Sequence, residues 1–170
     1  MFHVKRILQS RAIKGIIMLF LMSVVSGCIG ARQTIQIPDY ILVDNGMEVL
    51  GGKTLRAFIF ENNVKGVQIE QFLANKFKTS NYFEKEIWVT IENEKFKIIV
   101  YDNAEFEKYF NSANYAVINE EAKNENYSQR KFIALSVINS YNEDCLTDQS
   151  LFQNITIRYL KNLKDAYYNQ

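Results

Sequence analysis

Side chains able to carry out catalysis are scarce in this chain of 170 residues. It holds one histidine, His3, and two cysteines, Cys28 and Cys145. His3 lies in a segment that we expect to be cleaved off, so no imidazole would remain to activate a serine or cysteine nucleophile or to bind zinc. The sequence therefore argues against histidine-dependent hydrolysis and against the common imidazole metal sites.

Carboxylates are the remaining groups for acid–base chemistry. A glycosidase-like pair needs one carboxyl group whose pKa is raised by burial. The glutamates that come into question alternate with lysines or fall on predicted solvent faces: Glu84, Glu86, Glu92, Glu94, Glu105 and Glu107. Because this pattern favours a charged surface, we name no catalytic residue and regard an enzyme as the less favoured function.

One short motif imitates the end of a phosphate-binding loop. It consists of Gly52, Lys53 and Thr54, but the glycine expected five positions before Gly52 is replaced by Met47. The segment also runs into a predicted strand, so no helix N-terminus would face a phosphate. The sequence therefore predicts no nucleotide binding.

A second motif imitates a calcium loop. Asn142, Asp144 and Asp148 are spaced like oxygen ligands, yet the loop has no central glycine, and Gln153 stands where a closing glutamate would be required. A solvated turn and helix cap explains these residues better. We expect no metal site and no cofactor.

Charge and length restrict the partners. The four basic residues of the first 14 positions precede an apolar run, and without them 16 lysines and arginines face 19 acidic residues. A mildly acidic domain of this kind has no basic excess to hold a nucleic acid. The 143 residues from position 28 onward are enough for one hydrophobic core, so we expect a single domain.

The N-terminal region has the order of an export signal. A basic stretch over residues 1–14 is followed by an apolar stretch over residues 16–25, and Val25, Ser26 and Gly27 precede Cys28. The sequence VSGC resembles the lipobox of bacterial lipoproteins. This resemblance implies that the leader, residues 1–27, is removed and that Cys28 carries a diacylglyceryl group and often an acyl chain on its new amine.

The alternative is an uncleaved transmembrane helix. From Gly15 to Ile29 the chain offers about 15 mostly apolar residues, which span about 22 Å of helix against about 30 Å of hydrocarbon. The lipobox interpretation is therefore preferred, with two or three acyl chains as a stable membrane anchor. In lipoproteins of many Gram-negative bacteria, a residue other than aspartate after the cysteine directs the protein to the outer membrane. With Ile29 at that position, the resemblance implies the outer membrane, facing the periplasm, if the source is Gram-negative.

Cys145 is left without an intrachain partner if Cys28 is modified. A buried thiol packed before the last helix is the preferred interpretation, and an intermolecular disulfide is the alternative.

Hydrophobic periodicity in the remaining chain predicts alternating strands and helices. After a tether over residues 28–38, the predicted order is a strand at 40–43, a strand at 55–60, a helix at 67–78, a hairpin at 87–101, a helix after Asp102, a strand at 131–141 and a helix at 150–168. Asp102 and Glu105 have the spacing of an N-cap and its capping-box partner. In the hairpin, pairing of Glu92 with Lys95 places Ile87, Val89 and Ile91 on one apolar face. It places Trp88 opposite Ile99 on the second face, which we expect to be at least partly covered. Residues 119–130 are predicted to form an exposed loop.

The last helix contains the candidate contact residues. Its buried side is predicted to consist of Phe152, Ile155, Tyr159, Leu163 and Ala166. Aromatic side chains dominate the energetics of protein interfaces, so Tyr159, Tyr167 and Tyr168 are candidates for contact with a partner.

We expect an α+β fold for residues 39–170, with a mixed or mostly antiparallel sheet and about three helices on one face. The favoured function is that of a membrane-anchored, non-enzymatic module that binds another envelope protein, as an accessory of an envelope machine or as a toxin-neutralising immunity-type protein. The alternative is a histidine-free carboxylate hydrolase or a binder of a small envelope ligand.

Overall fold

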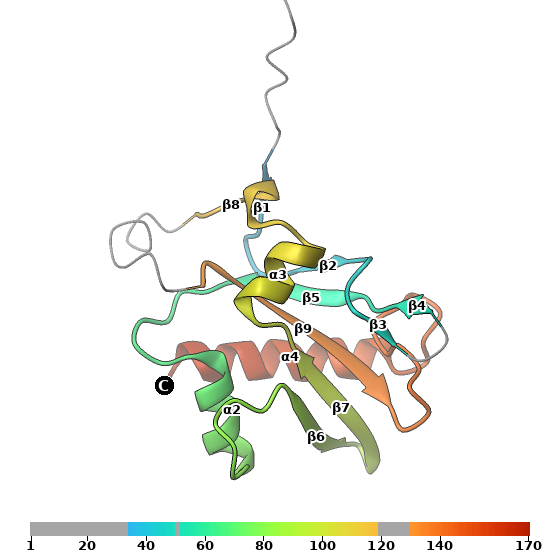
Figure 1. Cartoon of the computed structure of the whole chain (residues 1–170). Coiled ribbons are helices and arrows are strands. Elements are labelled where there is room, and N and C mark those ends of the chain that lie inside the picture. The colour runs from blue at the N-terminus through green and yellow to red at the C-terminus, as the bar shows by residue number, and fades with distance from the viewer. Residues whose placement is uncertain (1–33, 50–51, 119–129) are drawn as a thin grey trace, which may run out of the picture. The chain divides into compact units, whose positions relative to one another are not determined.

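A computed structural model describes residues 34–49, 52–118 and 130–170 (Figure 1). The predicted leader, Val25, Ser26, Gly27 and the lipobox Cys28 lie outside these residues, as does most of the predicted loop at 119–130. The strands are β1 (Ile35–Gln36), β2 (Ile41–Val43), β3 (Glu48–Val49), β4 (Lys53–Thr54), β5 (Ala57–Glu61), β6 (Glu86–Ile91), β7 (Glu94–Val100), β8 (Tyr115–Ala116) and β9 (Phe132–Asn139). The helices are α2 (Ile69–Phe77), α3 (Asn103–Tyr109) and α4 (Gln153–Tyr168), with a 3₁₀ turn at Ser112–Asn114.

The central sheet has five strands in the order β2-β5-β9-β7-β6, and each neighbouring pair is antiparallel. The predicted α+β class with a mostly antiparallel sheet is confirmed. β9 is the middle strand and is buried over its whole length. Its near-continuous apolar sequence follows from this position, because both faces of the central strand are covered. Two short pairs, parallel β1–β8 and antiparallel β3–β4, lie outside the central sheet.

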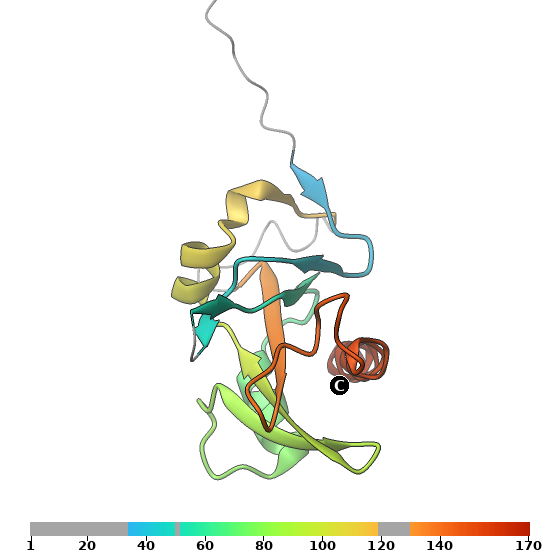
Figure 2. The same ribbon diagram turned by 90° about the vertical axis from the view of Figure 1, so that its right-hand side faces the viewer.

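The helices divide between the two faces of the sheet (Figure 2). Residues of α2 and α4 join the larger core with the β6–β7 hairpin, whereas Phe106 of α3 joins a second core with Ala57 and Ile59 of β5. The sequence predicted about three helices on one face of the sheet. Two of them, α2 and α4, share one face, whereas α3 packs against the opposite face. Alternate residues of β5 point to opposite faces, so each face of its apolar sequence needs its own cover.

The hairpin has the predicted faces but a different register. Ile91 pairs with Glu94 and Trp88 with Lys97, so the predicted pairing of Trp88 with Ile99 is wrong by two residues. The turn residues Glu92 and Asn93 both have positive φ, at 49° and 70°, as a two-residue type I′ turn requires. A shift by two keeps every side chain on its face, so the apolar pattern could not detect it.

α3 begins as its sequence predicts. The Asp102 side chain accepts a hydrogen bond from the Glu105 amide, and the Glu105 side chain accepts one from the Asp102 amide, both at 2.8 Å. This capping box satisfies two amides that a helix start leaves without partners, and it fixes the end of β7 relative to α3.

The predicted buried side of α4 does pack against the larger core, but Phe152, Ile155 and Tyr159 are only half-buried there. Leu163 is buried as expected, but the other buried residues of the helix are Thr156, Leu160, Lys164 and Tyr167. Thr156 is accommodated because its hydroxyl lies 3.0 Å from the Cys145 carbonyl oxygen and 2.9 Å from that of Phe152. A polar residue with satisfied hydrogen bonds can occupy a core position, which hydrophobic periodicity does not reveal.

Candidate functional site

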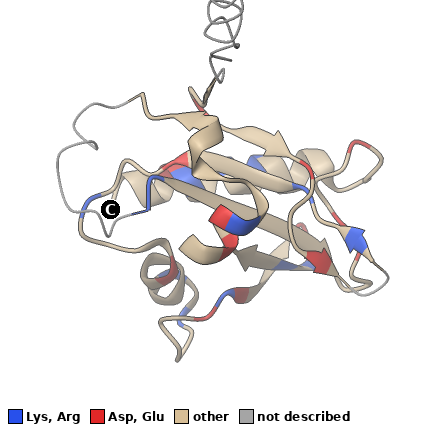
Figure 3. Cartoon of the chain, turned by 45° about the horizontal axis from the view of Figure 1, so that its top comes forward, with Lys and Arg blue, Asp and Glu red and all other residues tan. Residues whose placement is uncertain are grey.

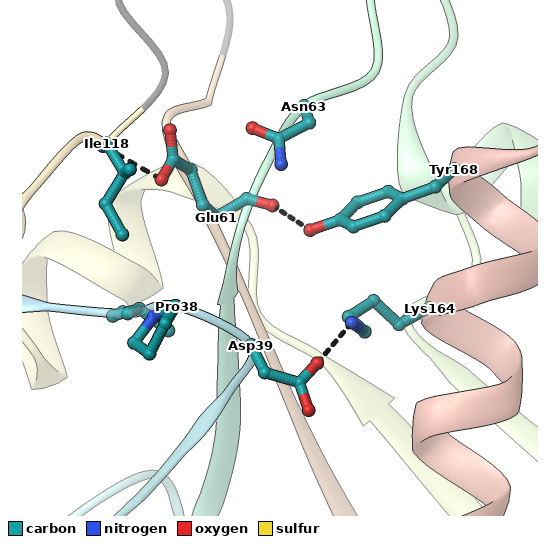
Figure 4. Close-up of a pocket in the computed structure, with 8 residues that line it drawn as sticks. Pro38, Asp39, Glu61, Asn63, Ile118, Lys164 and Tyr168 are labelled. Atoms are coloured by element: carbon teal, nitrogen blue, oxygen red, sulfur yellow. Dashed lines mark hydrogen bonds and ion pairs between the residues drawn. The ribbon is translucent and has the colours of Figure 1, made fainter.

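A small polar cavity of about 170 Å³ lies between the start of β2, the end of β5 and the C-terminal turns of α4. Figure 4 shows its lining residues, with Asp39 pointing toward Lys164 and Tyr168 toward Glu61. The cavity is lined by Ile37, Pro38, Asp39, Glu61, Asn63, Ile118, Lys164 and Tyr168. Because two acidic residues and a lysine meet here, this is the place to test the enzyme and small-ligand alternative.

Two charged groups of this cavity, Asp39 and Lys164, bind each other. Asp39 forms an ion pair with the nearly buried ammonium group of Lys164 and lies 3.2 Å from Lys161. The hydrogen bond from Lys164 lowers the pKa of Asp39. Burial alone would lower the pKa of Lys164, but the bonds to Asp39 and Asp165 raise it above its ordinary value. Asp39 thus stays ionised and Lys164 protonated, so neither is suited to act as an acid or a nucleophile near neutral pH.

The second carboxylate of the cavity is also engaged. Glu61 is 4% exposed, and its Oε2 accepts a hydrogen bond from the Ile118 amide at 3.0 Å. The Tyr168 hydroxyl donates to the Glu61 carbonyl oxygen at 2.5 Å, and burial raises the pKa of that phenol. The volume is also below the several hundred Å³ usual for ligand pockets. These contacts favour a structural role for the cavity.

A cluster around Arg56 replaces the calcium loop considered above. The Arg56 guanidinium lies 2.7 Å from Asp44 and 2.6 Å from Asp148, while the Arg56 amide donates to Asp144 at 2.6 Å. The Arg56 side chain thus supplies a positive charge to Asp44 and Asp148, and the Arg56 backbone supplies a hydrogen bond to Asp144. Among the described residues, no group of three or more His, Cys, Asp or Glu side chains is arranged to hold a metal ion.

The remaining motif residues lie in ordinary surroundings. Gly52, Lys53 and Thr54 form an exposed turn and the short strand β4, away from any helix start. Cys145 is a fully buried free thiol, as preferred on sequence grounds. Burial raises its pKa to about 12, so it remains a neutral thiol.

The three candidate tyrosines differ in accessibility. Tyr167 is fully buried, and its hydroxyl donates to the Val67 carbonyl oxygen at 2.8 Å. It therefore belongs to the core in this structure. Tyr159 and Tyr168 are half-buried against the larger core. A contact between these two side chains and a partner stays a prediction.

The strongest surface feature is the outer edge of the sheet at β6. β6 is the last strand in the sheet order, and no strand of the described residues pairs with its outer side. Its burial alternates: Ile87, Val89 and Ile91 are buried, while Glu86, Trp88 and Thr90 are exposed. α2 and α4 pack on the face of the buried residues, as part of the larger core. The exposed residues Glu86, Trp88 and Thr90 lie on the opposite face of the sheet.

Trp88 is the single tryptophan of the chain, and 53% of it is exposed. The Lys97 ammonium lies 5.1 Å from the ring centroid and 2.7 Å from Glu86. Beside it is an open groove of about 380 Å³ lined by Trp88, Val89, Thr90, Lys95 and Ser140, which we call the β6 groove. A large aromatic ring left exposed beside a groove is characteristic of a protein-binding surface.

Further exposed aromatic residues lie near the same edge in sequence or in space. Tyr82 and Phe83, 53% and 77% exposed, lie shortly before β6, from which Glu84 and Lys85 separate them. Tyr141, 84% exposed, follows Ser140 of the β6 groove. The sequence assigned Trp88 to a face that was at least partly covered, and so missed this surface. Its position opposite Lys97 on an edge strand depends on the register and strand order, which only the tertiary structure defines.

The chain matches no known protein family, no curated protein and no solved structure. Among the described residues, no helix has both the length and the apolar character needed to cross a membrane. Basic and acidic residues are interspersed over the described elements (Figure 3). The surface at β6 is therefore the candidate site on physical grounds.

Proposed function

We propose that this chain is a lipoprotein of the bacterial cell envelope, anchored through Cys28, whose α+β domain binds another protein through β6 and the β6 groove. In this proposal it acts as an accessory of an envelope machine or as an immunity-type inhibitor of a toxin. In a Gram-negative source it would lie on the outer membrane and face the periplasm.

The observation that carries the binding proposal is the exposed Trp88 on the edge strand β6, whose outer side pairs with no strand of the described residues. Burying a tryptophan side chain removes a large apolar area from water, which makes it a typical centre of an interface. The polar cavity at Asp39 and Lys164 offers no comparable support for a ligand or a reaction, because these two groups form an ion pair and the Glu61 carboxylate accepts a hydrogen bond from the Ile118 amide.

The anchor proposal rests on the sequence VSGC and on the basic and apolar stretches before it. The chain enters the described domain at Thr34, six residues after Cys28. Six residues span at most about 20 Å, so a lipid on Cys28 would hold the start of the domain close to the membrane surface. The proposed membrane attachment thus leaves little freedom for the domain to diffuse away.

The test is site-specific photocrosslinking of the full-length protein in intact cells. A photoreactive residue is placed at Trp88 and, as the matched control, at Asn162, which is exposed on α4. We expect one abundant protein adduct from position 88 and only background from position 162. Equal, diffuse labelling at both positions would contradict the binding surface.

The same purified samples test the anchor by mass spectrometry of the N-terminal peptide. We expect a peptide that begins with an acylated Cys28. An intact N-terminus at Met1 would contradict the lipoprotein proposal, whatever the crosslinking shows.

A further inference from the structure

The backbone of β6 has a defined inner and outer side. The Val100 amide donates to the Lys85 carbonyl oxygen at 2.8 Å, so these two residues form a hydrogen-bonded pair. Such pairs alternate along an antiparallel ladder, so Ile87, Val89 and Ile91 also direct their backbone groups toward β7. The N–H and C=O groups of Glu86, Trp88 and Thr90 therefore point away from the sheet.

The same three residues also present their side chains to solvent. Glu86, Trp88 and Thr90 are exposed on the open face. Both the free hydrogen-bonding groups and the accessible side chains thus occur at every second residue. Addition of an extended segment to a sheet edge uses this combination, because the backbone groups supply affinity and the side chains supply selectivity.

The ends of this edge are acidic. Residues 84–94 contain four glutamates and a single lysine, Lys85. That lysine is engaged away from the edge, by an ion pair with Asp102 and by a contact of 3.2 Å with Glu105. Glu86 and Glu92 form only exposed ion pairs, which contribute little. An added segment would gain from basic residues at its ends.

The position of the edge favours another protein over a second copy of this chain. β2, which follows β1 and the N-terminal side of the domain, is at the opposite edge of the sheet from β6. Figures 1 and 2 show β1 and the β6–β7 hairpin at opposite ends of the domain. Two copies joined through β6 in a continuous antiparallel sheet would send their N-terminal sides in opposite directions, which opposes anchoring in one membrane.

We propose, building on the binding function above, that the partner contributes one extended segment as an antiparallel sixth strand beside β6. Its β-branched or aromatic side chains would contact Trp88 and Thr90, and its lysines or arginines would face the glutamates at the two ends. The antiparallel direction follows the four pairings already present in the central sheet.

The probe is the peptide acetyl-Lys-Val-Thr-Val-Thr-Val-Lys-amide, titrated into the full-length protein. Trp88 is the only tryptophan, so its fluorescence reports directly on the edge. We expect saturable binding that weakens with added salt, because the ion pairs at the ends are exposed. A peptide with glutamate in place of both lysines should bind at least about tenfold more weakly.

Backbone pairing is tested by N-methylation of the peptide. Methyl groups on the two threonine amides remove the hydrogens that would face β6, and we expect a loss of about tenfold or more. Methylation of two valine amides is the matched control, since these amides would face outward. Equal loss with both methylated peptides would overturn strand addition.

The protein side of the ladder is tested at Thr90. Thr90→Pro removes an outward N–H but no bond to β7, so the fold should tolerate it as edge strands tolerate proline. We expect Thr90→Pro to abolish peptide binding and Thr90→Val to bind within about twofold of the original protein. If Thr90→Pro does not fold, the comparison of the two methylated peptides still tests whether the peptide pairs with the backbone of β6.

The outcomes separate this inference from the proposed function. A specific crosslink at Trp88 in cells that survives Thr90→Pro would leave protein binding intact but overturn strand addition. A concentration-dependent dimer in sedimentation that Thr90→Pro abolishes would identify a second copy as the occupant and overturn the inference of a separate partner. If the lysine peptide caused no saturable change of Trp88 fluorescence, the inference of strand addition at β6 would also be overturned.

Discussion

At the scale of single residues, Arg56 joins segments far apart in the chain. Its guanidinium binds Asp44 and Asp148, and its amide binds Asp144, so it fastens the loop after β9 to the start of β5. The side chain is only 17% exposed, whereas both ion-pair partners are largely solvated. The contribution of Arg56 to stability therefore comes more from the several hydrogen bonds that it makes at once than from the attraction between the charges.

We expect Arg56→Met to lower the free energy of unfolding by about 1–2 kcal/mol, because several hydrogen bonds are lost at once. The control is Arg158→Met, which removes an ion pair to Glu92 in which both side chains are more than half exposed. That change should cost about 0.5 kcal/mol or less. Urea unfolding at neutral pH compares the two, and equal costs would show that Arg56 is not a structural centre.

Cys145 makes a second prediction at this scale. Its burial and a pKa of about 12 mean that it should not react with a thiol reagent such as iodoacetamide near pH 8 while the protein is folded. Labelling followed by peptide mass spectrometry distinguishes Cys145 from Cys28. We expect modification of Cys145 only in urea; rapid modification of the folded protein would contradict the buried position.

At the scale of elements, the sequence was sufficient for those whose signals are local. Asp102 and Glu105 predicted the capping box, and the apolar alternation of β6 and β7 predicted a hairpin with the correct faces. The register of the hairpin and most of the fully buried positions of α4 were missed because they depend on partners elsewhere in the fold. Lys164, for example, is buried beside Asp39, 125 residues earlier in the chain. The exposure of Trp88 was missed for the same reason, since strand order decides which strand lies at the edge.

Substitutions in the turn between β6 and β7 should be able to stabilise the domain. Glu92 is a non-glycine residue held at a φ of 49°, which L-residues avoid, whereas Asn-Gly is the preferred pair for a type I′ turn. We expect the double change Glu92→Asn, Asn93→Gly to stabilise the domain by about 1 kcal/mol, and Asn93→Val to destabilise it by about 1–2 kcal/mol. Thermal unfolding monitored by circular dichroism measures both. Stabilisation by Asn93→Val would contradict the turn type.

At the scale of the whole molecule, ion pairs between distant elements couple stability to pH. The hydrogen bond from Lys164 lowers the pKa of Asp39, and that from Lys85 lowers the pKa of Asp102. A carboxylate with a lowered folded-state pKa stabilises the protein above its unfolded value, 3.8 here. This stabilisation is lost as the pH falls through the folded-state pKa.

We therefore expect the urea midpoint to fall on acidification below about pH 4, and to fall less steeply in Asp39→Asn and Asp102→Asn, which lack the titrating carboxylates. The neutral-pH midpoints of both variants should be lower than that of the original protein. Glu48→Gln, at an exposed position of β3 away from both ion pairs, is the control and should keep most of the acid sensitivity. If the urea midpoint fell with decreasing pH as steeply in both test variants as in the original protein, these two ion pairs would not be the source of the acid sensitivity.

The attachment of the N-terminal segment has a mechanical consequence. Tension applied to the chain before Thr34 acts first on the two-residue pairing of β1 with β8, and next on the contacts of Asp39 with Lys161 and Lys164 and of Tyr40 with Phe58. Each of these contacts is small and separate from the others, so we expect them to break one after another before the tension reaches β5. Because β5, β9 and β7 lie between β2 and β6, a pull on the N-terminal segment would be absorbed far from Trp88.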